Sequence, residues 1–355
     1  MEEEDLNLNN NISITQLVQV LEALKQASQN IQNHHNHFSD SPSIKALVQL
    51  LTILPTNSTL SHHINYLKTL VNSLHNSKPS LKSFITRPLS SHSITKTAAA
   101  IESELQSWID RETITTLSRL VSGNNIENEE DELLLLLTRF SDRVSQGFNR
   151  ELQQLVLNLK LFSLLESLLF DPKCSHRIRE HAGFAISALI RFNKDVFVGE
   201  VLMNPTVQAL IDIGSVRSIE VLRSLIRLIR SPIVDEIESN GEIPKIISLL
   251  NSNDMKLSLL AMECVLEIGY FGRKEAVEGM LKEGVVEKFV ELQRMESEFA
   301  SCVARFAVQL EVGEGLRQRE KRSFKSEILV RVREACVSDA EAATIVAEVL
   351  WGTSP

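Results

Sequence analysis

One stretch constrains the chain more than any other: residues 241–284, GEIPKIISLLNSNDMKLSLLAMECVLEIGYFGRKEAVEGMLKEG. Apolar residues recur at helical spacing from Ile243 to Leu250, and the polar residues 251–254 supply turn and N-cap chemistry before a second helix. That second helix, from Leu257 to Gly269, is apolar on most of its surface. It must therefore be covered on both flanks, which an isolated helical hairpin cannot do.

The pattern of this second helix recurs along the chain. Its frame is a small residue, Ala261, followed by two apolar residues, Cys264 and Ile268. The first members of successive frames lie 39, 40, 40 and 41 residues apart. Such a period indicates helical units that bury their apolar faces by stacking on one another. The other frames are Ala182, Ala185, Leu189; Val221, Ser224, Leu228; Ser301, Ala304, Val308; and Ala342, Ile345, Val349.

The order of residues within the central stretch resembles an armadillo repeat. The matching pattern is Gly-x-Ile, Ile-Ile-x-Leu-Leu-x-Ser, Leu-Ala-x-x-Cys-Val-Leu-x-Ile-Gly and a closing Gly284-Val285-Val286, and the resemblance covers roughly residues 152–311. It implies an all-α right-handed solenoid in which the third helix of each repeat lines an inner groove. Asn204-Pro205 stands where an opening glycine is expected, which predicts an abbreviated first helix in that unit, with HEAT-type pairing as the alternative.

Composition narrows the class of protein. The net charge of −9 argues against nonspecific nucleic-acid binding, which needs a basic face. The longest apolar run, Leu133–Leu137, is far short of a membrane span, and no signal-type segment follows the acidic start. We expect reduced, buried thiols and a cytoplasmic or nuclear location, because the cysteines Cys174, Cys264, Cys302 and Cys336 have no CxxC spacing.

The chain is predicted to hold two helical regions. Residues 1–11 read as a disordered acidic tail, 12–122 as an N-terminal helical bundle, 123–132 as an acidic linker and 133–355 as the solenoid with C-terminal capping helices. Within the bundle we expect helices at 43–54, 60–74 and 94–121, with an exposed connection at 77–93. The last helix, Ala340–Trp351, is predicted to seal the final repeat.

This order of domains resembles that of plant U-box ubiquitin ligases, in which a helical domain precedes a U-box and armadillo repeats. The chain departs from that family at the U-box itself. It has no Cys-Pro-Ile start, and the segment between Gly123 and Leu133 leaves no room for the domain. Ligase activity is therefore not expected.

No catalytic, cofactor or metal site is predicted. The chain lacks phosphate-binding glycine loops, HExxH and GxSxG, and the four-residue match at Ser93–Lys96 has none of its companion motifs. His34, His35 and His37 lie in a polar stretch with no carboxylate or cysteine cluster beside them, so we expect a solvated loop. The sequence therefore favours a non-enzymatic protein.

The third helices of the repeats give two columns of groove residues. The first column is Phe184, Arg223, Glu263, Val303 and Thr344, and the second is Ala188, Arg227, Glu267, Ala307 and Glu348. In nuclear-import armadillo proteins the equivalent columns resemble ladders of tryptophan and asparagine that clamp a basic peptide. Neither residue type occurs in either column here, which argues against that role.

Charge is instead segregated in these columns. Arg223, Arg227 and Arg230 recur at i, i+4 and i+7, while the next repeat offers Glu263 and Glu267. Either the arginines and glutamates pair laterally between repeats, or the arginines accept an acidic or C-terminal carboxylate segment. The candidate partner-binding residues are Phe184, Arg191, Arg223, Arg227, Arg230, Glu263, Glu267 and Tyr270.

The leading prediction is a protein-binding scaffold whose groove holds a segment of a partner protein, with no nucleic acid, membrane or cofactor involved. The alternative is an adaptor in ubiquitination, a relative of the plant ligases that lacks the U-box. The basic run Arg317–Lys325 is either a nuclear-localisation signal or the polar side of a helix.

Overall fold

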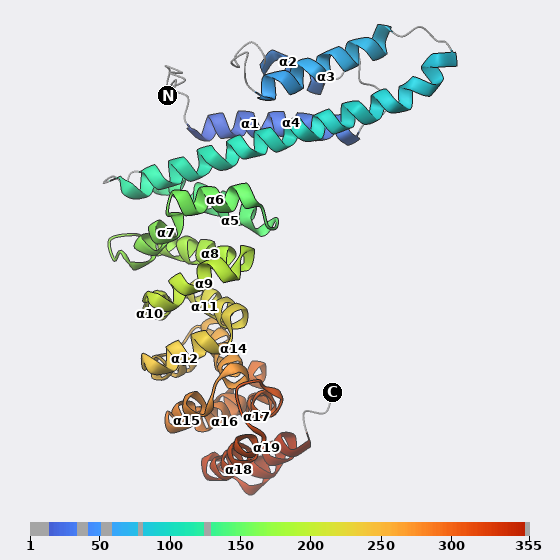
Figure 1. Cartoon of the computed structure of the whole chain (residues 1–355). Helices are drawn as coiled ribbons and strands as arrows, with labels where there is room; N and C mark the ends of the chain where they lie inside the picture. Colours follow the sequence, from blue (N-terminus) through green and yellow to red (C-terminus); the bar gives the residue numbers. More distant parts are fainter. Residues whose placement is uncertain (1–13, 34–41, 51–58, 77–80, 124–128, 352–355) are drawn as a thin grey trace. The chain divides into compact units, whose positions relative to one another are not determined.

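The computed structural model describes residues 14–33, 42–50, 59–76, 81–123 and 129–351, and no β-strand occurs among them (Figure 1). The chain divides into two compact units. Unit 1 comprises residues 1–125 and 149–161, and unit 2 comprises residues 126–148 and 162–355. The predicted all-α fold class is confirmed.

Unit 1 is a helical bundle built along one long helix. Helices α1 and α3 both pack along α4, and α6 also contacts α4. Between α1 and α4 the apolar core is edged by polar contacts: Ser28 Oγ donates to the carbonyl of Ala98 (2.6 Å), and Glu102 accepts from Gln29 and Gln32. The helices are α1 (Ile14–Asn33), α2 (Pro42–Leu50), α3 (Thr59–Asn76), α4 (Leu81–Ser122) and α6 (Arg150–Asn158).

Two predictions about unit 1 were wrong in detail. Helix α4 begins at Leu81, so most of the predicted connection at 77–93 is helical. Helix growth is cooperative, and the packed part of α4 from Ile94 onward supports the addition of residues with modest helix propensity. Helix α6 groups with unit 1 rather than with the solenoid, because it packs on α4. The predicted tail and the histidine loop at 34–37 lie outside the described residues.

Unit 2 is a solenoid of stacked helices. It begins with α5 inside the predicted acidic linker, at Glu130. Its helices are α5 (Glu130–Ser145), α7 (Leu161–Phe170), α8 (His176–Phe192), α9 (Lys194–Met203), α10 (Thr206–Ile213), α11 (Val216–Ile229), α12 (Ser231–Ser239), α13 (Ile243–Ser248), η2 (Leu249–Asn251), α14 (Met255–Phe271), α15 (Lys274–Lys282), α16 (Val285–Met295), η3 (Ser297–Phe299), α17 (Cys302–Val312), α18 (Gln318–Ala335) and α19 (Asp339–Trp351).

The solenoid repeats a unit of two helices followed by a third, which is the longest of its unit in α11 and α14. The pairs α9–α10, α12–α13 and α15–α16 precede α11, α14 and α17, and the single helix α18 takes the place of a pair before α19. Helices α8, α11, α14, α17 and α19 pack on one another in this order and are called the long-helix column, with the paired helices to one side (Figure 1). Side chains exposed on the column therefore lie in register from repeat to repeat.

Local sequence signals set where the repeat turns. Gly214 ends α10 with φ 60° and Gly284 lies between α15 and α16 with φ 73°, a left-handed conformation that glycine adopts without strain. Ser215 then caps α11 by accepting from the backbone N of Ser218, and Asp254 caps α14 by accepting from the backbone N of Lys256. The two serine and aspartate caps thus mark the starts of α11 and α14.

The buried frame holds in two column helices and fails in a third. Ala261, Cys264 and Ile268 of α14 are fully buried, as are the corresponding residues of α8. In α17 the predicted frame is wrong: Ser301 is a cap residue with φ 54°, and Val308 is exposed. Helix α17 has 11 residues, whereas α14 has 17, and α17 starts later within its repeat. It therefore buries a different stripe of side chains. This stripe includes Val303 and Ala307, which were predicted to line the groove.

Helix α10 follows Asn204-Pro205, is the helix that was predicted to be abbreviated, and has 8 residues, against 6 in α13 and 11 in α16. Helix α9 has 10 residues, and the Asn-Pro pair lies in the turn between α9 and α10. A buried carboxylate holds this turn: Glu166 of α7 accepts from Thr206 Oγ1 and Asn204 Nδ2, each at 3.0 Å. The turn thus has buried hydrogen-bond partners, and the unit has both of its short helices.

Burial raises the pKa of the Glu166 carboxyl above its ordinary value of 4.5; Thr206 and Asn204 oppose the shift, and Glu200 adds to it. A raised folded-state pKa stabilises the fold fully below about pH 4.5, and this contribution is lost as pH rises through the folded value. We expect the free energy of unfolding of Glu166→Gln, measured in urea, to rise relative to that of the wild type as the pH is raised from 4 to 8. In Thr206→Val, the free energy of unfolding should fall more with rising pH than in the wild type. Curves of unfolding free energy against pH that run parallel for all three proteins would contradict the assignment.

Candidate functional site

The long-helix column carries a ladder of charged side chains on α11 and α14. Arg223 Nη1 contacts Glu263 Oε2 at 2.9 Å, and Arg227 Nε contacts Glu267 Oε1 at 3.3 Å. We call these residues the arginine–glutamate ladder. The i, i+4 spacing places the two members on each helix one above the other, and the repeat aligns the two helices. The structure thus shows the lateral pairing that was one of the two interpretations of the sequence.

Arg191 of α8 extends the ladder to the preceding repeat. Its Nη2 donates to Ser224 Oγ on α11 at 2.9 Å, and Ser187 and Ser224 share a hydrogen bond at 3.0 Å. Ser224 occupies the second position of its frame, which Cys264 takes in α14, and its short side chain reaches both partners. The structure therefore joins Arg191 of α8 to α11 through Ser224, the residue that follows Arg223 in the sequence.

Arg230 does not continue the row of arginines. It is the C-cap of α11 with φ 70° and ψ −137°, so the chain has left helical geometry before the i+7 position is reached. Its guanidinium lies 5.9 Å from the centre of the Phe271 ring and 3.8 Å from Glu314. The prediction that Arg230 shares a helical face with Arg223 and Arg227 was wrong, because the helix ends at Ile229.

The loop that carries Glu314 packs tightly against the end of α14. The backbone N–H groups of Glu314 and Gly315 both donate to the carbonyl of Tyr270 (2.8 and 3.3 Å). Tyr270 is partly exposed, and its ring packs edge-on against Phe271 with the centroids 4.8 Å apart. The structure places Tyr270 at the C-terminal end of α14, next to the Arg230 and Glu314 pair.

Phe184 belongs to a second cluster nearer the start of the column helices. Arg217 lies over its ring at 5.1 Å and pairs with Glu180 at 3.6 Å, while Ser215 Oγ donates to Glu180 at 2.6 Å. Sequence reasoning missed Arg217 and Glu180. Their separation of 37 positions equals that of Ser187 and Ser224, so the spacing between neighbouring column helices was the signal that could have found them.

The electrostatics of the ladder are set by partial burial. Burial raises the pKa of Glu267, the neighbouring Arg227 and Arg223 oppose the shift, and Glu263 adds to it. Cys264, between the two glutamates in sequence, is fully buried, and burial raises the pKa of its thiol. A buried thiol with a raised pKa is a poor nucleophile. The ladder can hold charged and hydrogen-bonding groups, and nothing in it resembles a nucleophile with its base.

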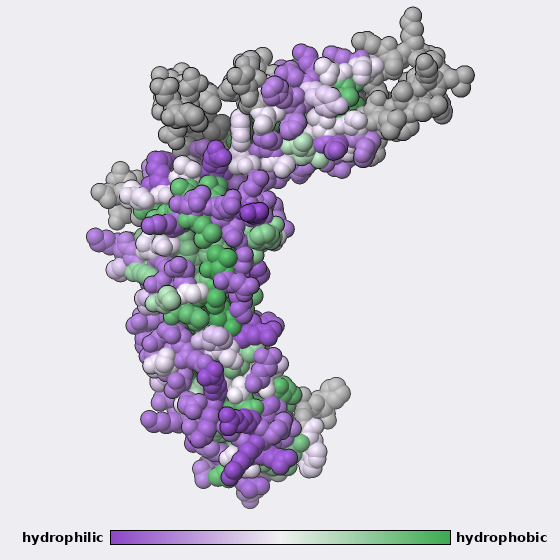
Figure 2. Space-filling model, viewed as in Figure 1, coloured by the Kyte–Doolittle hydropathy of each residue, from purple (hydrophilic) through white to green (hydrophobic). Residues whose placement is uncertain are grey.

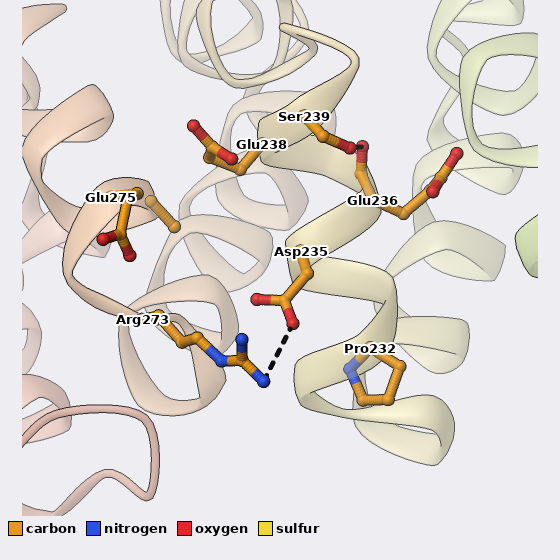
Figure 3. Close-up of a pocket in the computed structure, with 8 residues that line it drawn as sticks. Pro232, Asp235, Glu236, Glu238, Ser239, Arg273 and Glu275 are labelled. Carbon is orange, nitrogen blue, oxygen red and sulfur yellow. Dashed lines mark hydrogen bonds and ion pairs between the residues drawn. The ribbon is translucent and has the colours of Figure 1, made fainter.

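A shallow acidic pocket lies on the paired-helix side of the solenoid, between α12 and α15 (Figure 3). Arg273 Nη2 contacts Asp235 Oδ2 at 3.3 Å, and Glu236, Glu238 and Glu275 also line the pocket. No group of three or more histidine, cysteine or carboxylate side chains that could hold a metal ion occurs in the described parts of the chain. The pocket is an acidic patch of the surface with one ion pair.

The basic run Arg317–Lys325 lies at the start of α18, and two of its lysines have partners. The backbone N–H of Arg317 donates to Glu320 (2.8 Å), Lys321 Nζ donates to the carbonyl of Gly313, and Lys325 pairs with Glu311 at 2.8 Å. In the described ranges no single helix is long and apolar enough to cross a membrane, although the bent pairs α6–α7 and α9–α10 reach that threshold by length and composition. Figure 2 shows mainly hydrophilic side chains over the α14–α18 part of the face in view.

Three helices in each unit, repeated about every 40 residues, distinguish armadillo units from two-helix repeats. The solenoid is of the armadillo type. No family model matches the sequence, and no curated protein matches it either. Among solved structures it is similar to designed armadillo repeat proteins.

Three of the similar structures cover about two thirds of this chain. One designed armadillo repeat protein has 16% identity and a TM-score of 0.46, covering 66% of this chain and 98% of its own. Another, in complex with the peptide (KR)4, has 17% identity and a TM-score of 0.47, covering 67% and 98%. An engineered protein has 17% identity and a TM-score of 0.48, covering 66% and 98%. At these values the fold assignment rests on the repeat geometry of this chain itself.

Proposed function

We propose that this chain is a non-enzymatic scaffold that binds a segment of a partner protein on its long-helix column. The observation that carries the proposal is the arginine–glutamate ladder with its extension to Arg191. Its side chains are charged, partly exposed and held in register by rigid helices, which is the arrangement that fixes the position of an extended polypeptide. A scaffold of this kind needs no reactive group.

Two guanidinium groups are well exposed along the ladder and its extension. The side chain of Arg227 is 59% exposed against 22% for its partner Glu267, and Arg191 is exposed, whereas Arg223 and Glu263 are 30% and 33% exposed. Each ladder arginine contacts its glutamate through one nitrogen, and a guanidinium carries five N–H donors. A ligand that approaches Arg227 or Arg191 therefore meets positive charge first. We infer that the bound segment is acidic or ends in a carboxylate, because planar bidentate contacts suit both groups.

The test selects peptides from a displayed library of random decapeptides on the full chain, with a charge-swapped variant as the counter-target. The swap combines Arg223→Glu, Arg227→Glu, Glu263→Arg and Glu267→Arg, which preserves both lateral pairs and the net charge. Peptides enriched on the wild type should be rich in aspartate and glutamate, and should bind the swapped variant at least about tenfold more weakly.

The swap also separates binding from stability. Each exposed lateral pair contributes only about 0.2–1 kcal/mol, so the thermal unfolding midpoint of the swapped variant should change little. Peptides that bind both proteins equally, or an enrichment of basic peptides on the wild type, would reject the ladder as the site. Neither the described residues nor the comparisons support the ubiquitination alternative, and the cytoplasmic or nuclear location likewise stays a prediction.

A further inference from the structure

Arg230 lies just beyond the last turn of α11, at the end of the arginine–glutamate ladder. Along the ladder, each arginine of α11 pairs with the glutamate 40 positions later on α14. The same offset from Arg230 leads to Tyr270, which carries no charge at neutral pH. Helix α14 therefore offers Arg230 no carboxylate at the corresponding position.

The carboxylate next to Arg230 comes from a loop. Glu314 lies between α17 and α18, and its Oε2 is 3.8 Å from Arg230 Nη1. The loop is held by its main chain, because the backbone N–H groups of Glu314 and Gly315 donate to the carbonyl of Tyr270. The main chain, and not the Glu314 side chain, thus determines where the loop lies.

The pair of Arg230 and Glu314 is open to solvent. The two side chains are 58% and 50% exposed, and exposed ion pairs are weak, so another carboxylate can replace Glu314 at little cost. The guanidinium also lies 5.9 Å from the centre of the Phe271 ring, a cation–π contact that keeps it at the end of the column when Glu314 leaves. Arg230 is thus an accessible, pre-positioned cation whose partner is easily exchanged.

We propose that Arg230 binds an acidic side chain of the partner segment, and that Glu314 occupies this contact until the segment displaces it. The inference rests on the proposed function, since it concerns the same segment on the same column. Glu314 is then a competitor within the chain. It lowers the affinity for every acidic ligand, and so favours ligands that carry enough carboxylates to bind in spite of it.

The positions of the exposed arginines define the chemistry of this segment. Arg227 and Arg230 lie three residues apart, and Arg191 is exposed on the neighbouring helix α8. Three residues of extended chain span about 10 Å, so acidic residues two or three positions apart in a ligand reach Arg227 and Arg230 together. A bidentate contact joins one carboxylate to one guanidinium, so a single terminal carboxylate serves only one of these arginines. The ligand is therefore a segment with several acidic side chains.

Binding of a defined acidic peptide tests this exchange. The probe is decaglutamate with a fluorescein label and an amidated C-terminus, and its anisotropy is measured with the full chain at about 0.1 M salt. Glu314→Gln should lower the dissociation constant about two- to fivefold, the factor that corresponds to an exposed ion pair. Arg230→Gln should raise the constant at least about twofold, and adding Glu314→Gln to Arg230→Gln should then have little effect.

Glu311→Gln is the matched control. Glu311 is exposed and pairs with Lys325, so its substitution removes the same charge three residues away without touching Arg230. It should change the dissociation constant less than about 1.5-fold. The thermal unfolding midpoint of Glu314→Gln should match that of the wild type, because the backbone contacts of the loop remain.

Two outcomes would reject the competition alone. One is that decaglutamate binds, but Glu314→Gln binds it no more tightly than the wild type or Glu311→Gln does. The other is that Glu314→Gln tightens binding equally in the Arg230→Gln background.

A second probe, fluorescein-labelled (Gly-Ser)5 with a free C-terminus, represents a terminal carboxylate. Binding of this peptide without binding of decaglutamate would keep the column as a peptide site and reject the acidic segment. If neither peptide bound the wild type or Glu314→Gln, the ladder would be rejected as the site of the proposed function, and the competition with it.

Discussion

Gly315→Ala is expected to lower the free energy of unfolding of the solenoid by about 2–4 kcal/mol. A Cβ atom at Gly315 would lie 2.0 Å from the carbonyl oxygen and 2.5 Å from the carbonyl carbon of Gly272, and 2.7 Å from the carbonyl oxygen of Phe271. All three are backbone atoms, which cannot move aside as the end of a side chain can. The φ angle of Gly315 is not in the left-handed region, so the cost comes from contact alone.

Gly199→Ala is the control for this prediction. Gly199 lies within α9, and a Cβ atom there would have no neighbour within 4 Å. Replacing an unconstrained helical glycine with alanine should stabilise the chain by about 0.5–1 kcal/mol. Urea unfolding followed by circular dichroism measures both variants. If Gly315→Ala unfolded within about 0.5 kcal/mol of wild type, the tight packing of the loop on α14 would be contradicted.

Removal of residues 339–355 should destabilise the solenoid by about 3–6 kcal/mol. Ile345 and Val349 are 3% and 2% exposed, and full burial of such side chains contributes about 1.5–3 kcal/mol each. The truncation also exposes the surfaces of α17 and α18 that α19 covers, and removes the contacts between Arg294 and Glu341. We therefore expect a lower urea midpoint, and increased binding of a hydrophobic dye by the truncated chain.

Two further variants make this result interpretable. Ile345→Ala keeps the chain length and the exposed side of α19, and should cost about 2–4 kcal/mol by leaving a cavity. Removal of residues 352–355 alone should leave stability unchanged within about 0.5 kcal/mol, since α19 ends at Trp351. A soluble truncation at residue 338 with wild-type stability would show that α19 does not seal the solenoid.

Most of the architecture of the solenoid followed from periodicity. The recurrence of small and apolar residues about every 40 positions predicted stacked helical units, and the frames of α8 and α14 are fully buried. The frame failed in α17, where the helix is shorter and its buried stripe is displaced. Periodicity reports which residues repeat, but the length of a helix depends on where its caps lie, and the frame took Ser301, the N-cap of α17, for a buried small residue.

The site was predictable where it depends on helical spacing and on the repeat. Arg223 and Arg227 lie one turn apart, and the 40-residue period puts their glutamate partners beside them. The sequence did not predict the contact between Arg230 and Glu314, because the two residues are separated by two repeats and meet through a loop. It also missed Arg217, whose partners Phe184 and Glu180 lie on the preceding column helix.

The sequence by itself determined the helical class and the repeat period, and it offered the lateral pairing of the ladder as one of two interpretations, because each depends on spacing along one helix or between adjacent equivalent helices. The tertiary structure alone decided how far α4 extends, that Glu166 is buried at the turn before α10, and that a loop brings Glu314 to Arg230. These features depend on how the helices and loops pack. Packing joins residues far apart in the sequence, and no local pattern records which of them it brings together.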